Sequence, residues 1–91
     1  MRTVTVAELP NLEGATLGSG PWREISHDQI NRFADATADH QWIHVDPARA
    51  ATGPFGRTIA HGYLTLSLIP ALLDDLLHVN GAGQAINYGL D

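Results

Sequence analysis

The most apolar part of the chain begins at Gly62 and continues to about Val79. Leucine and isoleucine side chains in this stretch surround most of the circumference of a helix, a pattern typical of a helix that is buried on nearly every side. The pattern therefore predicts one long buried helix. Pro70 should kink it, because proline lacks the amide hydrogen that a helix interior uses.

A second helix is predicted upstream, where polar and apolar positions alternate at helical spacing. Ser26 followed by Gln29 has the form of a capping box, which marks the start of a helix. Ile30 and Phe33 then continue one apolar face. We expect a helix from about His27 to Ala38.

Shorter elements complete the pattern. Asp46-Pro47 predicts the start of a short helix that Gly53-Pro54 ends, since Asp accepts hydrogen bonds from free backbone amides and Pro suits the first turn. The segment Asp39–Asp46 is mixed in polarity and predicts a loop. Trp22–Ile25 and Ala85–Leu90 predict short strands.

The chain offers little that could cover the long apolar helix. The first twenty residues are weakly patterned and predict only a short helical turn at Val6–Leu9. A buried helix needs a sheet or several helices to pack against, yet the strand that follows it reaches the last residues of the sequence. We expect residues 1–91 to be the N-terminal part of a single domain.

Composition narrows the range of functions. The chain has 91 residues, 44% of them hydrophobic, with no Cys, 5 basic residues that are all Arg, and a net charge of −5. Nucleic acids and anionic membranes require clustered cations, so neither is expected as a partner. Disulfides, thiolate nucleophiles and Cys-based zinc sites are excluded. No signal peptide or membrane span is recognisable, and we expect a cytoplasmic protein.

Histidine and aspartate side chains gather around one loop. Asp39 and His44 flank it, and a carboxylate and an imidazole that share one water molecule can divide the work of general acid and base. The alternative is a solvated Asp at a helix end and a His with a structural hydrogen bond. His40 and His44 could instead be a metal pair, with Asp39 or His61 as further ligands. Because the chain has no Cys and no HExxH pattern, we expect no metal.

A second candidate site lies at His61-Gly62, where the apolar helix begins. A glycine here would let a ligand approach free backbone amides, and such amides stabilise a developing oxyanion, for example on a thioester carbonyl. Alternatively, Gly62 only relieves a tight turn and His61 is a hydrogen-bonding core residue. A serine nucleophile is not expected, because the three serines lie outside any GxSxG motif.

These residues lie in a longer run that is identifiable. From Phe33 to Pro47 the chain reads FADATADHQWIHVDP. This run resembles the hydratase-2 signature of the MaoC-like (R)-specific enoyl-CoA hydratases, which is roughly an aromatic residue, a spacer and G-D-x-N-P-aliphatic-H-x-D. The resemblance continues through Gly53–Gly56 and Ile59–Gly62, and it covers about residues 22–90.

The resemblance implies an α+β hot-dog fold, in which an antiparallel sheet wraps a long helix, here Tyr63–Val79. The helix Ile30–Ala38 and the loop after it would form the family's overhanging segment, which carries the active site. By position, Asp39 and His44 match the catalytic aspartate and histidine. Gly62 matches the glycine whose amide polarises the thioester carbonyl. The sheet of the family continues for several strands beyond the position where this sequence ends.

The signature differs from this chain at two places. Gln41-Trp42 stands where the family has Asn-Pro, and Ala38 replaces the Gly before the aspartate. Gln41 keeps an amide that could orient active-site groups, whereas Trp42 removes a rigid proline. Both changes leave the Asp39–His44 pair intact.

The resemblance also implies an activity, the reversible addition of water to a trans-2-enoyl-CoA to give the (R)-3-hydroxyacyl-CoA, in fatty acid metabolism. Coenzyme A would be part of the substrate, and no separate cofactor is expected. The complete protein would be a homodimer. The alternatives are a 3-hydroxyacyl-[acyl-carrier-protein] dehydratase and a non-catalytic acyl-CoA-binding half domain. A thioesterase on this fold usually lacks the Asp-x4-His pairing.

Overall fold

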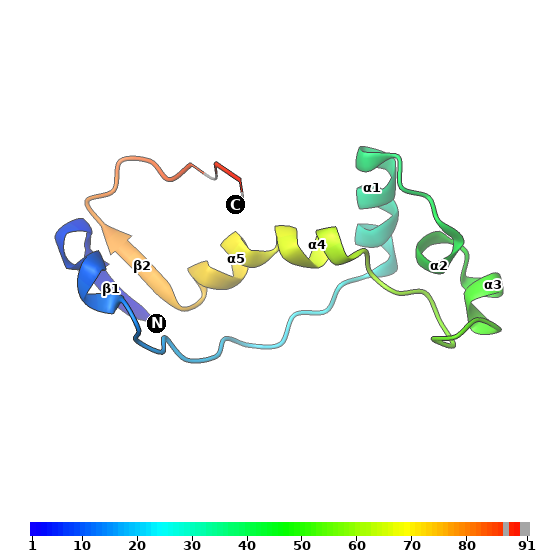
Figure 1. Cartoon of the computed structure of the whole chain (residues 1–91), viewed down its shortest axis with the longest axis horizontal. Coiled ribbons are helices and arrows are strands. Elements are labelled where there is room, and N and C mark those ends of the chain that lie inside the picture. The colour runs from blue at the N-terminus through cyan, green and yellow to red at the C-terminus, as the bar shows by residue number, and fades with distance from the viewer. Residues whose placement is uncertain (87, 90–91) are drawn as a thin grey trace. The chain divides into compact units, whose positions relative to one another are not determined.

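The computed structural model describes residues 1–86, 88 and 89. The described elements are mostly short helices, in chain order β1 (Arg2–Thr5), the 3-10 helix η1 (Val6–Leu12), α1 (His27–Thr37), α2 (Trp42–Val45), α3 (Pro47–Ala51), α4 (Gly62–Ser67), α5 (Ile69–Asp74) and β2 (Leu77–Asn80) (Figure 1). They form two compact units. One contains Met1–Pro21 and Ala71–Asp91, and the other contains Trp22–Pro70.

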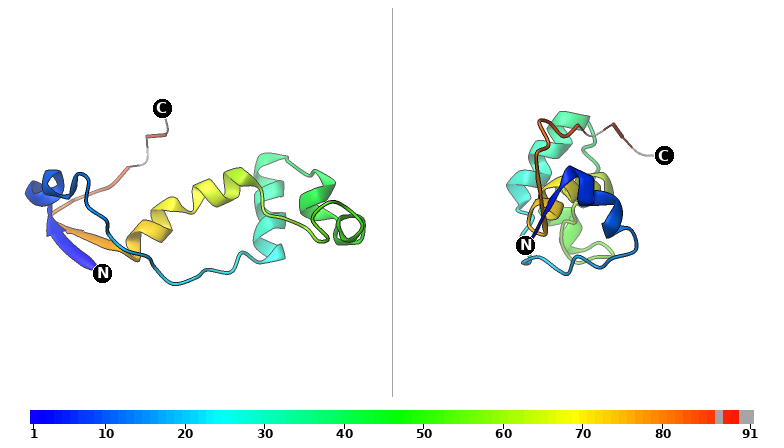
Figure 2. Two further views of the ribbon diagram at one scale, coloured as in Figure 1. Left: turned by 60° about the horizontal axis from the view of Figure 1, so that its bottom comes forward. Right: turned by 90° about the vertical axis from the view of Figure 1, so that its left-hand side faces the viewer.

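The first unit is built on one pair of strands. β1 and β2 lie side by side in both views of Figure 2, and they pair in parallel with Arg2 opposite Leu77 and Val4 opposite Val79. Neither strand was among those predicted, and their parallel pairing differs from the antiparallel sheet that the family resemblance implies. Most of the chain lies between them, and parallel strands require such a long connection. The buried side chain of Val4 anchors the pair.

The predicted helical turn near the N-terminus is present and extends over all of η1. Its start is a capping box, in which the Thr5 amide donates to Glu8 Oε1 at 2.9 Å. Hydrogen bonds from the backbone and then the side chain of Thr5 hold the pKa of the Glu8 carboxyl below its usual range. The capping box therefore favours the ionised carboxylate of Glu8.

Helix α1 confirms the prediction from the capping box. Ser26 Oγ accepts from the Gln29 amide at 3.1 Å, and the Ser26 amide donates back to Gln29 Oε1 at 3.1 Å. The apolar face buries Ile30 and Ala34. The helix ends at Thr37 and is capped by Ala38, whose φ of 60° is left-handed. This conformation costs a non-glycine residue roughly 1–2 kcal/mol, and a glycine would adopt it more readily.

We expect Ser26→Ala to lower the free energy of unfolding by about 1 kcal/mol, because it removes an N-cap oxygen. Thermal melting followed by circular dichroism measures the change. Ser19→Ala is the matched control, since Ser19 is exposed and outside any helix or strand. Equal melting temperatures for the two variants would show that the cap is not stabilising.

The predictions for the middle of the chain are partly right. Helix α3 begins as expected, with Asp46 Oδ1 accepting from the Arg49 amide at 3.1 Å and Pro47 in the first turn. The segment Asp39–Asp46, however, is not all loop, because α2 forms within it. Its turn is held by the Gln41 carbonyl, which accepts from the His44 amide at 3.0 Å.

The long helix from Gly62 to Val79 is wrong as one element. The structure divides it into α4 and α5 at Leu68, and the chain then enters β2. Pro70 explains the break, because it cannot donate the amide hydrogen bond that would carry α4 forward. Among the described residues, the apolar side chains of this stretch differ widely in exposure. Leu64 is 8% exposed, but Tyr63 and Ile69 are 76% and 50% exposed.

The two other predicted strands differ from the structure. Trp22–Ile25 is irregular and the Trp22 side chain is fully exposed, and the described residues provide no strand beside this segment with which it could form a ladder. Of the predicted strand Ala85–Leu90, positions 87 and 90 lie outside the described residues, and the others are not in a strand. In the described part of the chain, no helix is long and apolar enough to cross a membrane.

Candidate active site

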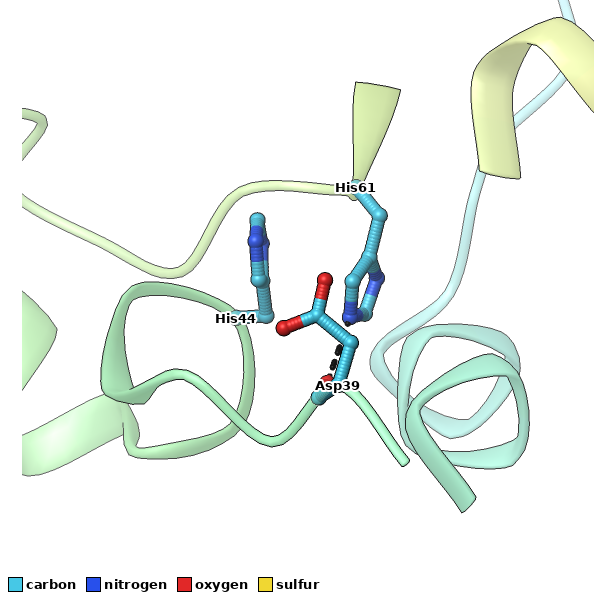
Figure 3. A group of neighbouring side chains, drawn as sticks. All are labelled: Asp39, His44 and His61. Carbon is cyan, nitrogen blue, oxygen red and sulfur yellow. Dashed lines mark hydrogen bonds between the residues drawn. The ribbon is translucent and has the colours of Figure 1, made fainter. Parts of the chain in front are cut away.

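Three side chains from separate segments of the second unit converge. Asp39 follows the end of α1, His44 lies in α2, and His61 immediately precedes α4. One carboxylate oxygen and one ring nitrogen from each histidine all lie within 4.8 Å of one another (Figure 3). Asp39 is exposed, whereas His44 and His61 are 7% and 2% exposed. The structure thus brings the predicted Asp39–His44 pair together and adds His61.

The end of α1 sets the direction of Asp39. The left-handed conformation of Ala38 turns the chain away from the helix axis, and the Asp39 amide still donates to the Ala34 carbonyl at 3.2 Å. The carboxylate is therefore carried just past a fixed helix end. Ala38, which differs from the glycine of the signature, adopts the conformation that glycine would favour.

His44 is fixed through its ring. Its Nδ1 lies 2.7 Å from the Ile59 carbonyl oxygen. A carbonyl can only accept a hydrogen bond, so Nδ1 carries the proton and the neutral ring leaves Nε2 as its acceptor. The Ile59 amide also donates to the Ile43 carbonyl at 3.0 Å, which ties the same two segments together. The free nitrogen is the one that could exchange a proton with a substrate.

Trp42 holds α2 against α3. A Cβ atom at Gly53 would lie 2.9 Å from the Trp42 ring, so only glycine allows the indole to approach this closely. The Arg49 guanidinium lies over the same ring, 4.4 Å from its centroid. Packing by Trp42 therefore fixes the short helix that carries His44, at the position where the signature has a proline.

His61 makes contacts to both other members of the group. Its Nε2 donates to the backbone carbonyl of Asp39 at 2.9 Å, and its ring stacks on the His44 ring with centroids 3.9 Å apart. Phe33 contacts His61 with ring centroids 4.9 Å apart. Sequence reasoning gave His61 only a structural role or a place in a metal site. The available signal was its position next to Gly62.

The arrangement favours an acid–base pair over a metal centre. His40 is outside the group, since its exposed ring bonds to Asp35 Oδ1 at 2.9 Å. With Nε2 of His61 committed to a carbonyl, only Nδ1 could bind a metal. That nitrogen is buried without a hydrogen-bond partner and lies on the side of the ring away from the Asp39 carboxylate (Figure 3). The three side chains therefore do not present free donor atoms to one common point.

Gly62 begins α4 beside this group. Its amide takes part in none of the hydrogen bonds found among the described residues. A Cβ atom at Gly62 would meet nothing within 4 Å. With Tyr63 and Leu66, Gly62 lines an open cavity of about 470 Å³. The amide is therefore open to a ligand, and neither Asp39 nor His44 lines this cavity.

Comparison with known proteins agrees with the fold. The family model of the MaoC-like domain matches residues 8–91, and the chain belongs to this family. It is similar to the (R)-hydratase from A. caviae involved in PHA biosynthesis, with a TM-score of 0.55 and 32% identity over 84% of this chain and 63% of that one. The predicted hot-dog fold is confirmed, with helices and few strands among the described residues.

Curated relatives are named as dehydratases and hydratases. The 3-hydroxyacyl-thioester dehydratase Z of Mycobacterium tuberculosis is 54% identical over 92 residues, which cover 100% of this chain and 61% of that protein. The (R)-specific enoyl-CoA hydratase of Aeromonas caviae is 38% identical over 65 residues, which cover 68% of this chain and 48% of that protein. Nodulation protein N of Rhizobium leguminosarum is 45% identical over 93 residues, covering 100% and 58%. The chain thus spans about three fifths of the length of dehydratase Z and of nodulation protein N.

Proposed function

We propose that the protein is a hydro-lyase that adds water reversibly across the double bond of a trans-2-enoyl thioester of coenzyme A and gives the (R)-3-hydroxyacyl thioester. The observation that carries the proposal is the approach of the Asp39 carboxylate to the His44 ring. One of these groups is an anionic acceptor, and the other has Nδ1 committed to a carbonyl and Nε2 free. Such a pair can hold one water molecule and exchange protons with it.

In the proposed reaction the oxygen of that water attacks C3 of the substrate. The water gives up one proton to the pair Asp39–His44, and the pair returns a proton to C2, so that water is added in full. Negative charge develops on the thioester oxygen during the attack. The Gly62 amide stabilises it, because a donor aimed at developing charge acts most strongly in the transition state. We assign the roles of base and acid to Asp39 and His44 as a pair.

Coenzyme A is the proposed carrier, and an acyl carrier protein is the alternative. Two relatives carry names that specify CoA, the (R)-specific enoyl-CoA hydratase and the 3-hydroxybutyryl-CoA dehydratase of Methylorubrum extorquens, which is 41% identical over 69 residues. With a net charge of −5 and arginine as its only strong cation, this chain has little with which to attract an acidic carrier protein. We further propose a cytoplasmic homodimer in which residues 1–91 belong to one domain.

The test is the loss of enoyl absorbance when the protein is mixed with crotonyl-CoA, with chiral analysis of the product. The same assay is applied to a hybrid protein, in which residues 1–91 replace the matching segment of the mycobacterial dehydratase Z. Hydration to the (R) product by either protein supports the proposal. Binding of crotonyl-CoA without turnover in both would instead favour a non-catalytic acyl-CoA-binding role. Free CoA released without hydration would indicate a thioesterase.

We expect prolonged dialysis against EDTA to leave the turnover number unchanged within about twofold, because the proposed steps use only Asp39, His44 and a backbone amide. Elemental analysis of the protein before and after dialysis shows whether any metal was removed. Loss of activity that is restored by one added divalent metal would contradict a metal-free mechanism. It would indicate instead that Asp39, His44 and His61 form a metal site.

A further inference from the structure

We propose that His61 is a positioning residue that holds Asp39 and His44 in their reactive arrangement through two separate contacts. This inference rests on the proposed function. One contact is the hydrogen bond from Nε2 to the Asp39 carbonyl, and the other is the stack against the His44 ring. His61 itself does not touch the reacting atoms in this proposal.

The burial of His61 fits such a role. At 2% exposure it is one of the most buried side chains in the described part of the chain, and Phe33 covers another side of its ring. Its Nδ1 has no hydrogen-bond partner, which is a cost to stability that a purely structural side chain would be expected to avoid. An apolar ring of the same shape would avoid that cost, but it could not donate to Asp39.

The contact to Asp39 matters because it adds a second backbone hydrogen bond to the one from the Asp39 amide to the Ala34 carbonyl. The side chain of Asp39 is exposed, and its backbone leaves α1 through a left-handed residue. The bond from His61 joins this turn to the start of α4, 22 residues later in the chain. Since His61 directly precedes Gly62, the same residue also links the acid–base pair to the amide that is proposed to bind the thioester oxygen.

The two contacts can be removed one at a time. His61→Phe keeps a stacked ring and loses the donor to Asp39. His61→Gln keeps an N–H group that can reach the Asp39 carbonyl and loses the ring. His40→Gln is the matched control, because His40 is exposed and bonds to Asp35 instead.

We expect each His61 variant to lower kcat by about 10–10²-fold with KM within about twofold, since a displacement of about 1 Å can cost about 10²-fold in rate. In NMR spectra of the whole protein, the ring protons of His44 should move downfield in His61→Gln and stay shielded in His61→Phe. The Asp39 carbonyl carbon should move in His61→Phe and much less in His61→Gln. His40→Gln should leave kcat and the His44 ring resonances unchanged; the Asp39 carbonyl carbon is compared only between the wild type and the two His61 variants, because it is bonded to the nitrogen of residue 40.

The kinetics test the proposed function, and the spectra test the role of His61 independently of it. If the wild-type protein does not hydrate crotonyl-CoA, the proposed function fails, while the spectra still report whether His61 holds both residues. Unchanged His44 resonances in His61→Gln, or an unchanged Asp39 resonance in His61→Phe, would overturn the proposal. So would variants whose KM rises while kcat stays at the wild-type value, because that pattern indicates substrate binding by His61.

Discussion

Asp39→Asn and His44→Gln should each lower kcat by about 10²–10⁴-fold with little change in KM, because each removes a group that exchanges protons only during the reaction. Asn keeps the shape of the aspartate but loses its negative charge. Gln keeps a donor that can reach the Ile59 carbonyl but cannot take up a proton. Steady-state hydration of crotonyl-CoA measures both constants.

The double variant sharpens this expectation. If Asp39 and His44 work as one unit, the double substitution should be little slower than either single one, since removing either member already disables the pair. His40→Gln is the matched control and should keep wild-type kcat, because the His40 ring lies outside the group. Near wild-type turnover by Asp39→Asn or His44→Gln would eliminate the proposed mechanism.

Local signals in the sequence predicted the local structure well. The capping box at Ser26 and the Asp46-Pro47 start depend on atoms within one helical turn, and both helices begin where expected. The division of the apolar stretch at Leu68 was missed, although Pro70 pointed to a distortion. Hydrophobic side chains alone do not reveal where a helix ends, because Leu77 and Val79 of β2 continue the run of apolar side chains.

Only part of the site was predicted, because its members are joined by both local and long-range contacts. Asp39 and His44 are close in the chain and stand in a recognisable run, so their pairing could be proposed before the structure was known. The place of His61 depends on a contact across 22 residues, and the packing of Trp42 depends on an approach to Gly53. No periodicity encodes such contacts. They arise from tertiary packing, which sequence patterns constrain only weakly.

Gly62→Pro should lower kcat by about 10²–10³-fold, the loss typical of removing one donor to a developing oxyanion. Proline deletes the amide hydrogen and little else here. Gly62 is the first residue of α4, a position that proline favours. His61 before it has φ −61° and ψ 140°, the extended conformation that a residue preceding proline adopts.

Gly62→Ala is the matched control, because it keeps the amide and places a Cβ atom where nothing lies within 4 Å. We expect this variant to retain kcat within about threefold, and both variants to melt near the wild-type temperature, since proline at a compatible position does not destabilise a fold. Equal kcat values for the proline and alanine variants would show that the amide does not act on the substrate. In that case the hydrogen-bond donor that stabilises the thioester oxygen must be sought elsewhere around Asp39 and His44.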